Sequence, residues 1–207
     1  MRLATELPRI DRLHTERLCL RRWCDADREA IAAINADPKV TELLVGPLPR
    51  EMSDAMIDRI EVHFRVNGFG LWALERRADG ALLGFTGAQR VPFQASFTPA
   101  VEIGWRLRAD VWGQGYATEA AEAVLADAFT RLGLEQIVAF TVPANRRSQA
   151  VMHRLGMRRD PNSDFDHPRL PAGHPLRRHW LYRINRAAWA GARQRLFSPQ
   201  PVRENEA

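Results

Sequence analysis

The sequence predicts a mixed α/β fold. Segments with strand-like and helix-like patterns follow one another as β-α-α-β-β-β-α-β-α-β, and no repeat, low-complexity stretch or linker separates them. The chain has 207 residues, which suits a single domain. We expect this domain to span residues 1–196, and we expect a frayed tail over residues 197–207, which contain two prolines.

The first third of the chain is predicted to form one strand and two helices. Residues 15–23 alternate leucines with charged neighbours, which is typical of a strand. Asp25 is a suitable N-cap for a helix over residues 27–35. A second helix is predicted over residues 50–67, where apolar side chains recur every four residues, and Gly68 should end it.

A hairpin and a third strand are predicted next. Residues 70–76 and 82–91 are strand-like and flank Asp79-Gly80, a favoured hairpin turn. A loop over residues 92–99 then leads to a strand over residues 100–107.

The rest of the chain alternates helices and strands. A glycine-bearing turn at residues 112–115 precedes a helix over residues 116–132. A β-branched strand follows over residues 136–142, then a helix over residues 145–155, and finally a strand over residues 177–184.

Composition predicts a soluble cytoplasmic protein. Hydrophobic residues make up 45% of the chain and charged residues 27%, but no apolar run approaches the ~20 residues of a membrane span. The first ten residues lack the apolar stretch of a signal peptide. Cys19 and Cys24 are too few for a disulfide scaffold, so we expect two buried free thiols.

The net charge of +5 is consistent with nucleic acid, an acidic partner or a phosphate-bearing cofactor. The arginines are scattered without a basic run of five, and we find no aromatic platform beside a basic groove. Nucleic-acid binding is therefore disfavoured. Six tryptophans in a small domain would leave aromatic surface that a homodimer could cover.

The most informative unit is the strand over residues 101–107, followed by a glycine turn and a helix. A helix N-terminus has unpaired N–H groups and the positive end of the helix dipole, and glycines let a ligand approach the backbone. The turn at Gly113 and Gly115 is thus suited to a pyrophosphate. It lacks the lysine of a Walker A loop and the third glycine of a dinucleotide fingerprint.

This unit resembles the acetyl-coenzyme A-binding core of the GNAT acetyltransferase superfamily. The similar residues run from Glu102 through Trp105 and from Gly113 to Ala120, and they are most like the branch of ribosomal-protein N-terminal acetyltransferases. The family turn, Gln/Arg-x-x-Gly-x-Gly/Ala, is matched at Gly115 and Ala117 but has Trp112 at its first position.

The resemblance implies a fold and a co-substrate. It implies a central, mostly antiparallel, twisted sheet of six to seven strands with a splayed parallel pair, flanked by about four helices. It also implies that acetyl-CoA binds without a metal, its pyrophosphate on backbone amides of residues 113–118 and its pantetheine arm beside residues 105–107. The implied cofactor-binding residues are Trp105, Leu107, Trp112, Gly113, Gln114, Gly115, Tyr116, Ala117, Thr118, Asn145 and Ser148.

A second element supports this resemblance. Asn145 and Ser148 have the spacing of a helix cap, which alone would explain both residues. They also resemble the second GNAT signature, in which Asn and Ser face the cofactor and the helix ends in Leu-Gly-Phe, here Leu155-Gly156-Met157. Many family members have a tyrosine general acid four residues before this glycine, and Met152 occupies that position here.

The chemistry requires an amine that loses a proton before it attacks the thioester. Glu102 is the candidate base, because it lies on the strand that should border the thioester. Glu119 is better explained by the helix dipole. Ser148 is the candidate donor to the leaving thiolate, and a backbone N–H near residues 105–107 can stabilise the oxyanion.

Asp160, Asp164 and Asp166 form an acidic stretch, and the segment from Asp160 to His179 contains three histidines. Its spacing fits no metal-ligand pattern, so we favour a substrate-facing loop, although its aspartates could also bind a cationic substrate or supply the base.

Acetyl transfer to a primary amine in a ternary complex is therefore predicted. The acceptor is either a protein N-terminus or a small amine, and the sequence does not separate the two. The alternative is a catalytically silent acyl-CoA-binding or sensing domain, which Met152 favours and which Glu102 and Ser148 oppose.

Overall fold

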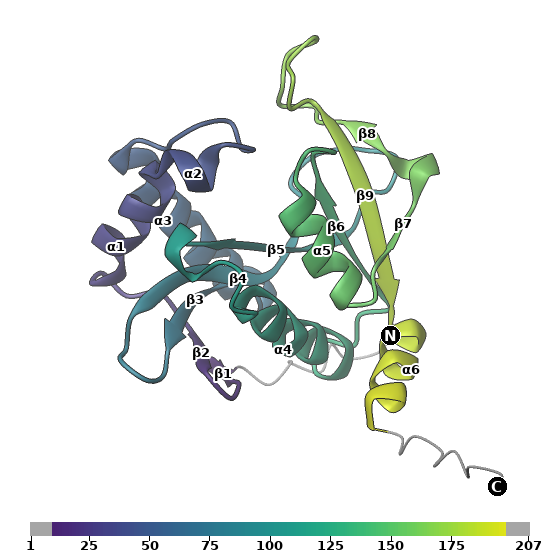
Figure 1. The fold of residues 1–207 in the computed structure, drawn as a ribbon, viewed down its shortest axis with the longest axis horizontal. Coiled ribbons are helices and arrows are strands. Elements are labelled where there is room, and N and C mark those ends of the chain that lie inside the picture. The colour runs from purple at the N-terminus through teal and green to yellow at the C-terminus, as the bar shows by residue number, and fades with distance from the viewer. Residues whose placement is uncertain (1–9, 198–207) are drawn as a thin grey trace, which may run out of the picture.

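The computed structural model of the protein describes residues 10–197 and has one extended, twisted sheet with helices on both faces (Figure 1). The sheet has nine strands in the order β1-β2-β3-β4-β5-β6-β9-β7, and β8 pairs with β9 off this path. The strands are β1 (Arg12–His14), β2 (Leu18–Arg21), β3 (Leu71–Arg76), β4 (Leu82–Arg90), β5 (Val101–Leu107), β6 (Gln136–Thr141), β7 (Arg158–Arg159), β8 (Phe165–Asp166) and β9 (Arg178–Asn185).

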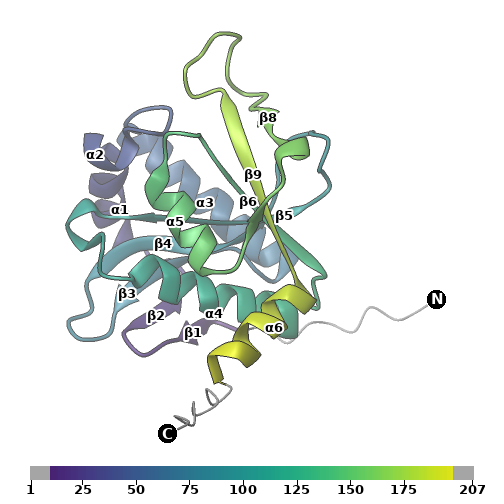
Figure 2. The same cartoon turned by 45° about the vertical axis from the view of Figure 1, so that its right-hand side comes forward.

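Six α-helices occur within the described residues. In Figure 2, α3 lies behind the sheet, whereas α4 and α5 lie in front of it. The helices are α1 (Asp27–Ala36), α2 (Pro38–Thr41), α3 (Arg50–Asn67), α4 (Tyr116–Thr130), α5 (Arg146–Arg154) and α6 (Arg186–Phe197); two 3₁₀ turns, η1 (Ala109–Val111) and η2 (Pro161–Ser163), complete the secondary structure.

One pair of strands differs from the others. Every pairing in the sheet is antiparallel except that of β5 with β6, and these two strands are in register only at Glu102 and Val138. Both strands continue past this point without further pairing, so they diverge towards their C-terminal ends. The predicted splayed parallel pair is confirmed, and its closed end lies at Glu102.

The core fixes this geometry. Every residue of β5 pairs with β4, from Leu107 opposite Gly84 to Val101 opposite Arg90. β4 therefore supports β5 where β5 separates from β6. Between the sheet and the helices, side chains such as Leu74, Leu125 and Ile137 are almost fully buried. Burial of each such leucine or isoleucine side chain contributes roughly 1.5–3 kcal/mol to the free energy of folding.

Several predicted elements are confirmed closely. Helix α3 has the predicted bounds, and Gly68 ends it in the left-handed conformation, with its N–H donating to Phe64 O at 2.9 Å. The hairpin turns at Gly80, where φ is +72°, and β4 and β5 begin and end within one residue of prediction.

The predicted numbers of strands and helices were too low. Strands β7 and β8 have two residues each and α2 has four, which is too short for a periodic pattern to be visible. Helix α6 follows β9 without a break, and Asn185 Oδ1 accepts from Ala188 N–H at 2.8 Å at its start. Residues 198–207 of the expected tail lie outside the described residues.

The N-terminal strand and cap also differ from expectation. Residues 15–23 include only the short strand β2, because Thr15 and Leu18 close a tight turn between β1 and β2. Asp25 does not cap α1; instead the Asp27 carboxylate accepts from the Cys24 N–H at 2.9 Å and from Arg21. Cys19 is buried as predicted, but Cys24 is exposed.

Within residues 10–197, no helix combines the length and apolar character that crossing a membrane requires.

Candidate active site

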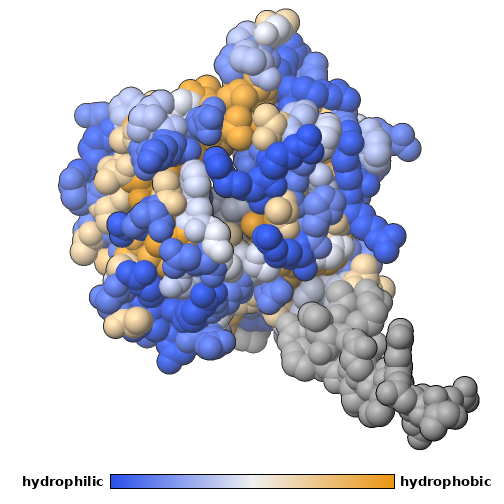
Figure 3. Space-filling model, viewed as in Figure 1, coloured by the Kyte–Doolittle hydropathy of each residue, from blue (hydrophilic) through white to orange (hydrophobic). Residues whose placement is uncertain are grey.

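A large cavity extends from the glycine turn before α4 to the N-terminal helices. Its volume is ≈ 1310 Å³, more than the ~300–1,000 Å³ of typical small-molecule pockets, so there is room for two substrates. Figure 3 shows hydrophobic surface flanked by hydrophilic residues between the α2 side and the β8–β9 side of the molecule. We call the part lined by residues 111–119 and α5 the cofactor arm, and the part lined by α2, α3, the end of β4, the cavity face of β5 and Arg169 the acceptor arm.

The cofactor arm contains the predicted glycine turn. Gly113 and Gly115 have φ of +78° and +84°, values that L side chains rarely adopt, and a Cβ at Gly113 would meet no atom within 4 Å. Helix α4 has no side-chain cap, and its first backbone bond runs from Glu119 N–H to Gly115 O. The N–H groups of Tyr116, Ala117 and Thr118 therefore lie at an open helix N-terminus, which suits an anion such as a pyrophosphate.

Four side chains brace this turn, two from within it and two from outside. The Trp112 indole donates to Leu107 O at 2.9 Å, and the Arg147 guanidinium stacks 4.3 Å from the centre of its ring. Gln114 turns its side chain back to Asp110 O at 3.2 Å, while Arg17 donates to Gln114 O at 3.0 Å. Trp112 therefore supports the turn, and the side-chain nitrogen and backbone carbonyl of Gln114 are both engaged within the chain.

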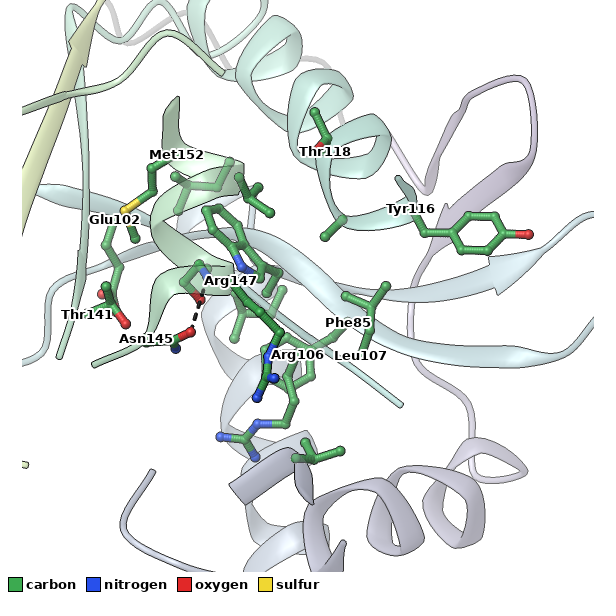
Figure 4. A pocket seen from close by; sticks show the side chains of 18 of the residues that line it. Phe85, Glu102, Arg106, Leu107, Tyr116, Thr118, Thr141, Asn145, Arg147 and Met152 are labelled. Atoms are coloured by element: carbon green, nitrogen blue, oxygen red, sulfur yellow. Dashed lines mark hydrogen bonds between the residues drawn. The ribbon is translucent and has the colours of Figure 1, made fainter. Parts of the chain in front are cut away.

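Asn145 is the N-cap of α5. Its Oδ1 accepts from the Ser148 N–H at 3.1 Å, so the capping interpretation of this pair is confirmed (Figure 4). Both residues also line the cavity. Among the described residues, the Ser148 hydroxyl makes no hydrogen bond, so it remains available as a donor.

Glu102 lies where β5 and β6 begin to separate. Gln89 Nε2 donates to Glu102 Oε1 at 2.6 Å, and the carboxylate lines the cavity. Desolvation raises the pKa of Glu102 to about 7, although Gln89 and the positive charge of Arg169 both lower it. A carboxylate with a pKa near neutrality is well matched to accept a proton from an ammonium group.

Glu119 has a different environment. It accepts from the Thr15 hydroxyl, from the Arg17 N–H at 2.9 Å and from the Arg17 guanidinium at 2.6 Å. Burial raises the pKa of Glu119, but these hydrogen bonds outweigh it and the pKa is lowered overall. Glu119 thus anchors the N-terminal segment to α4, and its donors leave it poorly suited to be a base.

No tyrosine occupies the position of the family's general acid. The chain has two tyrosines, Tyr116 and Tyr182. The Tyr116 ring points away from the other labelled side chains (Figure 4) and lies under Arg17, while Tyr182 does not line the cavity. Met152 lines the cavity and is almost fully buried, and His153 points elsewhere, as expected from its helical position.

Sequence reasoning missed three polar groups of the cavity. Thr141 is buried at the end of β6, and Arg106 donates from Nη1 to Asn35 Oδ1 at 2.6 Å. His63 accepts from the Arg90 N–H at 3.1 Å through Nε2 and donates to Phe69 O through Nδ1, so neither of its nitrogens is free to act as a base. Only the alternation of Glu102, Gly104 and Arg106 along β5 could have pointed to Arg106.

The loop over residues 160–179 reaches the cavity through Arg169, but its aspartates do not. Asp160 pairs with Arg183, Asp164 with Arg159, and Asp166 with Arg177 and Arg178. None of these aspartates lines the cavity, so they are not placed to bind a substrate there. In the described part of the chain, no three His, Cys, Asp or Glu side chains are grouped as metal ligands would be.

Comparisons with known proteins agree with this geometry. A family model described as an acetyltransferase (GNAT) domain matches residues 17–158. A curated relative from Aspergillus fumigatus, FsC-acetyl coenzyme A-N(2)-transacetylase, is 33% identical over 156 residues, which are 70% of this chain and 64% of the relative. The chain therefore spans less than two thirds of that relative's length.

Solved structures share the same architecture. An acetyltransferase from Agrobacterium tumefaciens is 29% identical, with a TM-score of 0.69 over 89% of this chain and 98% of that one. RimJ from Mycobacterium smegmatis, solved in complex with CoA-disulfide, is 21% identical, with a TM-score of 0.65 over 84% of this chain and 88% of that one; at that identity the likeness shows the fold. The chain thus belongs to the GNAT family of acetyltransferases.

Proposed function

We propose that this protein transfers the acetyl group of acetyl-CoA directly to a primary amine, with Glu102 as general base. The observation that carries the proposal is the position of Glu102. Its carboxylate has a pKa of about 7 and lies at the closed end of the splayed β5–β6 pair, in a cavity that also contains the open N-terminus of α4.

The splayed strands supply the reaction site. The amides at residues 113–118 would hold the pyrophosphate, and the thioester would extend between β5 and β6 towards Glu102. Glu102 takes a proton from the ammonium group, the amine nitrogen bonds to the carbonyl carbon, and the carbon–sulfur bond breaks. A backbone N–H on the unpaired edge of β5, near Trp105, would stabilise the oxyanion.

The leaving thiolate needs little acid assistance, because a thiol has a pKa of about 8.5. The Ser148 hydroxyl, which lines the cofactor arm without a partner in the described chain, is the side chain that we assign as hydrogen-bond donor to the sulfur. With Met152 in place of tyrosine, solvent completes the protonation. This arrangement accounts for catalysis without a tyrosine acid.

The Aspergillus relative's name describes acetyl transfer from acetyl coenzyme A to an N(2) position. We take from it only the class of reaction, acetylation of nitrogen. Both a protein N-terminus and a small amine remain candidate acceptors, because the acceptor arm opens to the surface between α2 and the β8–β9 side.

The test is release of coenzyme A thiol from acetyl-CoA in the presence of a panel of peptide and small primary amines. We expect turnover by the wild type and a 10²–10⁴-fold lower kcat for Glu102→Gln, with the affinity for acetyl-CoA unchanged. Glu135→Gln, at an exposed glutamate paired with Arg186, is the matched control and should retain activity.

The second candidate, a silent acyl-CoA-binding domain, is favoured by Met152 alone. It predicts tight binding of acetyl-CoA with no thiol release above the uncatalysed rate for any amine. That outcome would overturn the catalytic proposal while leaving the binding site intact.

A further inference from the structure

The acceptor arm is basic, although the amine that it would receive is itself a cation. Its charged lining comprises one carboxylate, Glu102, and five cationic side chains: Lys39, Arg59, Arg90, Arg106 and Arg169. A polyamine without anionic groups would be repelled by such a surface. Such a lining favours an acceptor that carries negative charge in addition to its amine.

Arg106 is the most informative of these cations. It lies partly buried near the end of β5, on the same strand face as Glu102 because the two are four residues apart. Its hydrogen bond to Asn35 uses one of five donors, and its nearest aromatic contact is Phe85, 5.4 Å from guanidinium to ring centre. No carboxylate pairs with it among the described residues.

The side chain of Arg106 is also held in a fixed direction. Asn35 and Ser53 are both fully buried, and Asn35 Nδ2 donates to the Ser53 hydroxyl at 2.8 Å, which leaves Asn35 Oδ1 to accept from Arg106. Figure 4 shows Arg106 directed into the cavity. A desolvated guanidinium without a counterion is costly unless a ligand supplies the charge, and carboxylates match its donor geometry.

The space between Glu102 and Arg106 is open. Gly104 separates them on the same face of β5, and a Cβ at Gly104 would meet no atom within 4 Å. Four residues of a strand span about 13 Å between Cα atoms. An acceptor whose amine lies at Glu102 would thus present its anionic group to Arg106 at a separation of roughly 10 Å, the length of about three extended residues.

We propose that Arg106, oriented by Asn35 and Ser53, binds a carboxylate of the acceptor, so that the preferred substrate is an amine with an acidic group about three residues' length away. This inference rests on the proposed function for the position of the amine. Either an acidic peptide or an extended ω-amino acid has the required chemistry.

The test measures equilibrium binding of matched acceptors to the coenzyme A complex by calorimetry, which needs no turnover. One pair is a C-terminally amidated tripeptide with aspartate or asparagine at its third position; the other is an extended ω-amino acid and its amide. The wild type should bind the acidic member of at least one pair ten or more times more tightly, and the pair that shows the preference identifies the source of the carboxylate.

The variants are Arg106→Gln, which keeps a donor for Asn35, and Arg108→Gln as the control, since Arg108 pairs with Asp110 and lies outside the cavity lining. Arg106→Gln should lose the preference for the acidic ligand and keep its affinity for acetyl-CoA, and Arg108→Gln should keep both. Thermal unfolding of each variant checks that it is folded.

Three results would overturn the proposal: a wild type that binds both members of each pair equally, a preference that survives in Arg106→Gln, or a loss of acetyl-CoA affinity in Arg106→Gln, which would make Arg106 a cofactor contact. If acidic acceptors bind preferentially but no acetyl is transferred to them, the proposed catalysis fails while the assignment of Arg106 stands.

Discussion

Two helix N-termini border the same cavity, and they satisfy their backbone donors in opposite ways. Helix α5 is capped by its own sequence, since Asn145 Oδ1 accepts from the Ser148 N–H. Helix α4 follows its N-cap Gly115 without any side-chain cap, and the residues of its first turn line the cavity. A helix end near a ligand site that is left uncapped is available for an anion, whereas a capped end is a structural element that also contributes side chains.

The same contrast separates the two glutamates near these helices. Glu119 is saturated by Thr15 and Arg17, so it stabilises the fold. Glu102 has one amide donor, Gln89, and desolvation raises its pKa. Glu119, whose carboxylate has several donors within the chain, is structural. Glu102, whose carboxylate has a single donor, is the functional candidate.

The largest effect is expected from Gly115→Glu. The substitution places a carboxylate in the anion site at a φ of +84°, so affinity for acetyl-CoA should fall at least 100-fold in calorimetric titration. Gly80→Glu is the matched control, because Gly80 has φ of +72°, open space around it and a position in the exposed β3–β4 turn. Equal losses in both variants would mean that backbone strain, and not the anion site, is responsible.

The pH dependence of catalysis should follow Glu102. Since its pKa is raised to about 7, kcat/KM should rise roughly tenfold per pH unit below 7 and level off above it. In Glu102→Gln this rise should disappear. A wild-type profile without an inflection near neutrality would argue against Glu102 as the base.

A cap introduced into α4 should weaken acetyl-CoA binding about tenfold. Asn tolerates the left-handed conformation and caps helices well, so Gly115→Asn should compete with the pyrophosphate for the N–H groups of α4. Its melting temperature should stay within a few degrees of wild type, which the same calorimeter can establish. Unchanged affinity would show that the amides do not carry the ligand's charge.

The raised pKa of Glu102 should also make the free energy of unfolding depend on pH. Its folded pKa of about 7 lies above the ordinary glutamate pKa of 4.5, so its contribution to the free energy of unfolding is fully present below pH 4.5 and is lost as pH rises through 7. Glu102→Gln should therefore be more stable than wild type at pH 8, by roughly 1–3 kcal/mol in urea unfolding. A variant less stable than wild type at pH 8 would contradict the desolvation of this carboxylate.

The smallest effect on ligand binding is expected from Asn145→Ala. Loss of this cap should cost about 1 kcal/mol of unfolding free energy. Because the cap is satisfied within the chain, the affinity for acetyl-CoA should change less than about threefold, or 0.7 kcal/mol. A larger loss of affinity would place Asn145 in direct contact with the cofactor.

Sequence patterns predicted those features that depend on residues close together in the chain. The bounds of α3, the hairpin turn at Gly80 and the Asn145 cap all depend on residues close in sequence. The glycine turn at Gly113 and Gly115 was predicted from the residues themselves, whereas the splayed strand pair came from resemblance to a family. Neither periodicity nor spacing could place them in one cavity.

Long-range contacts account for what the sequence concealed. Arg106 reaches Asn35 across 71 positions of the chain, and Glu119 reaches Thr15 across 104, so neither partner could be inferred from spacing. The raised pKa of Glu102 depends on burial by other elements, and the short strands β7 and β8 form because β9 offers a pairing edge.

The most direct measurement compares the calorimetric affinity of the wild type for acetyl-CoA and for S-acetylpantetheine, which has the same thioester arm but no pyrophosphate. If the open N-terminus of α4 holds the pyrophosphate, acetyl-CoA should bind at micromolar concentration and S-acetylpantetheine at least 100-fold more weakly. Equal affinities would contradict that role, and absence of acetyl-CoA binding would contradict the site as a whole.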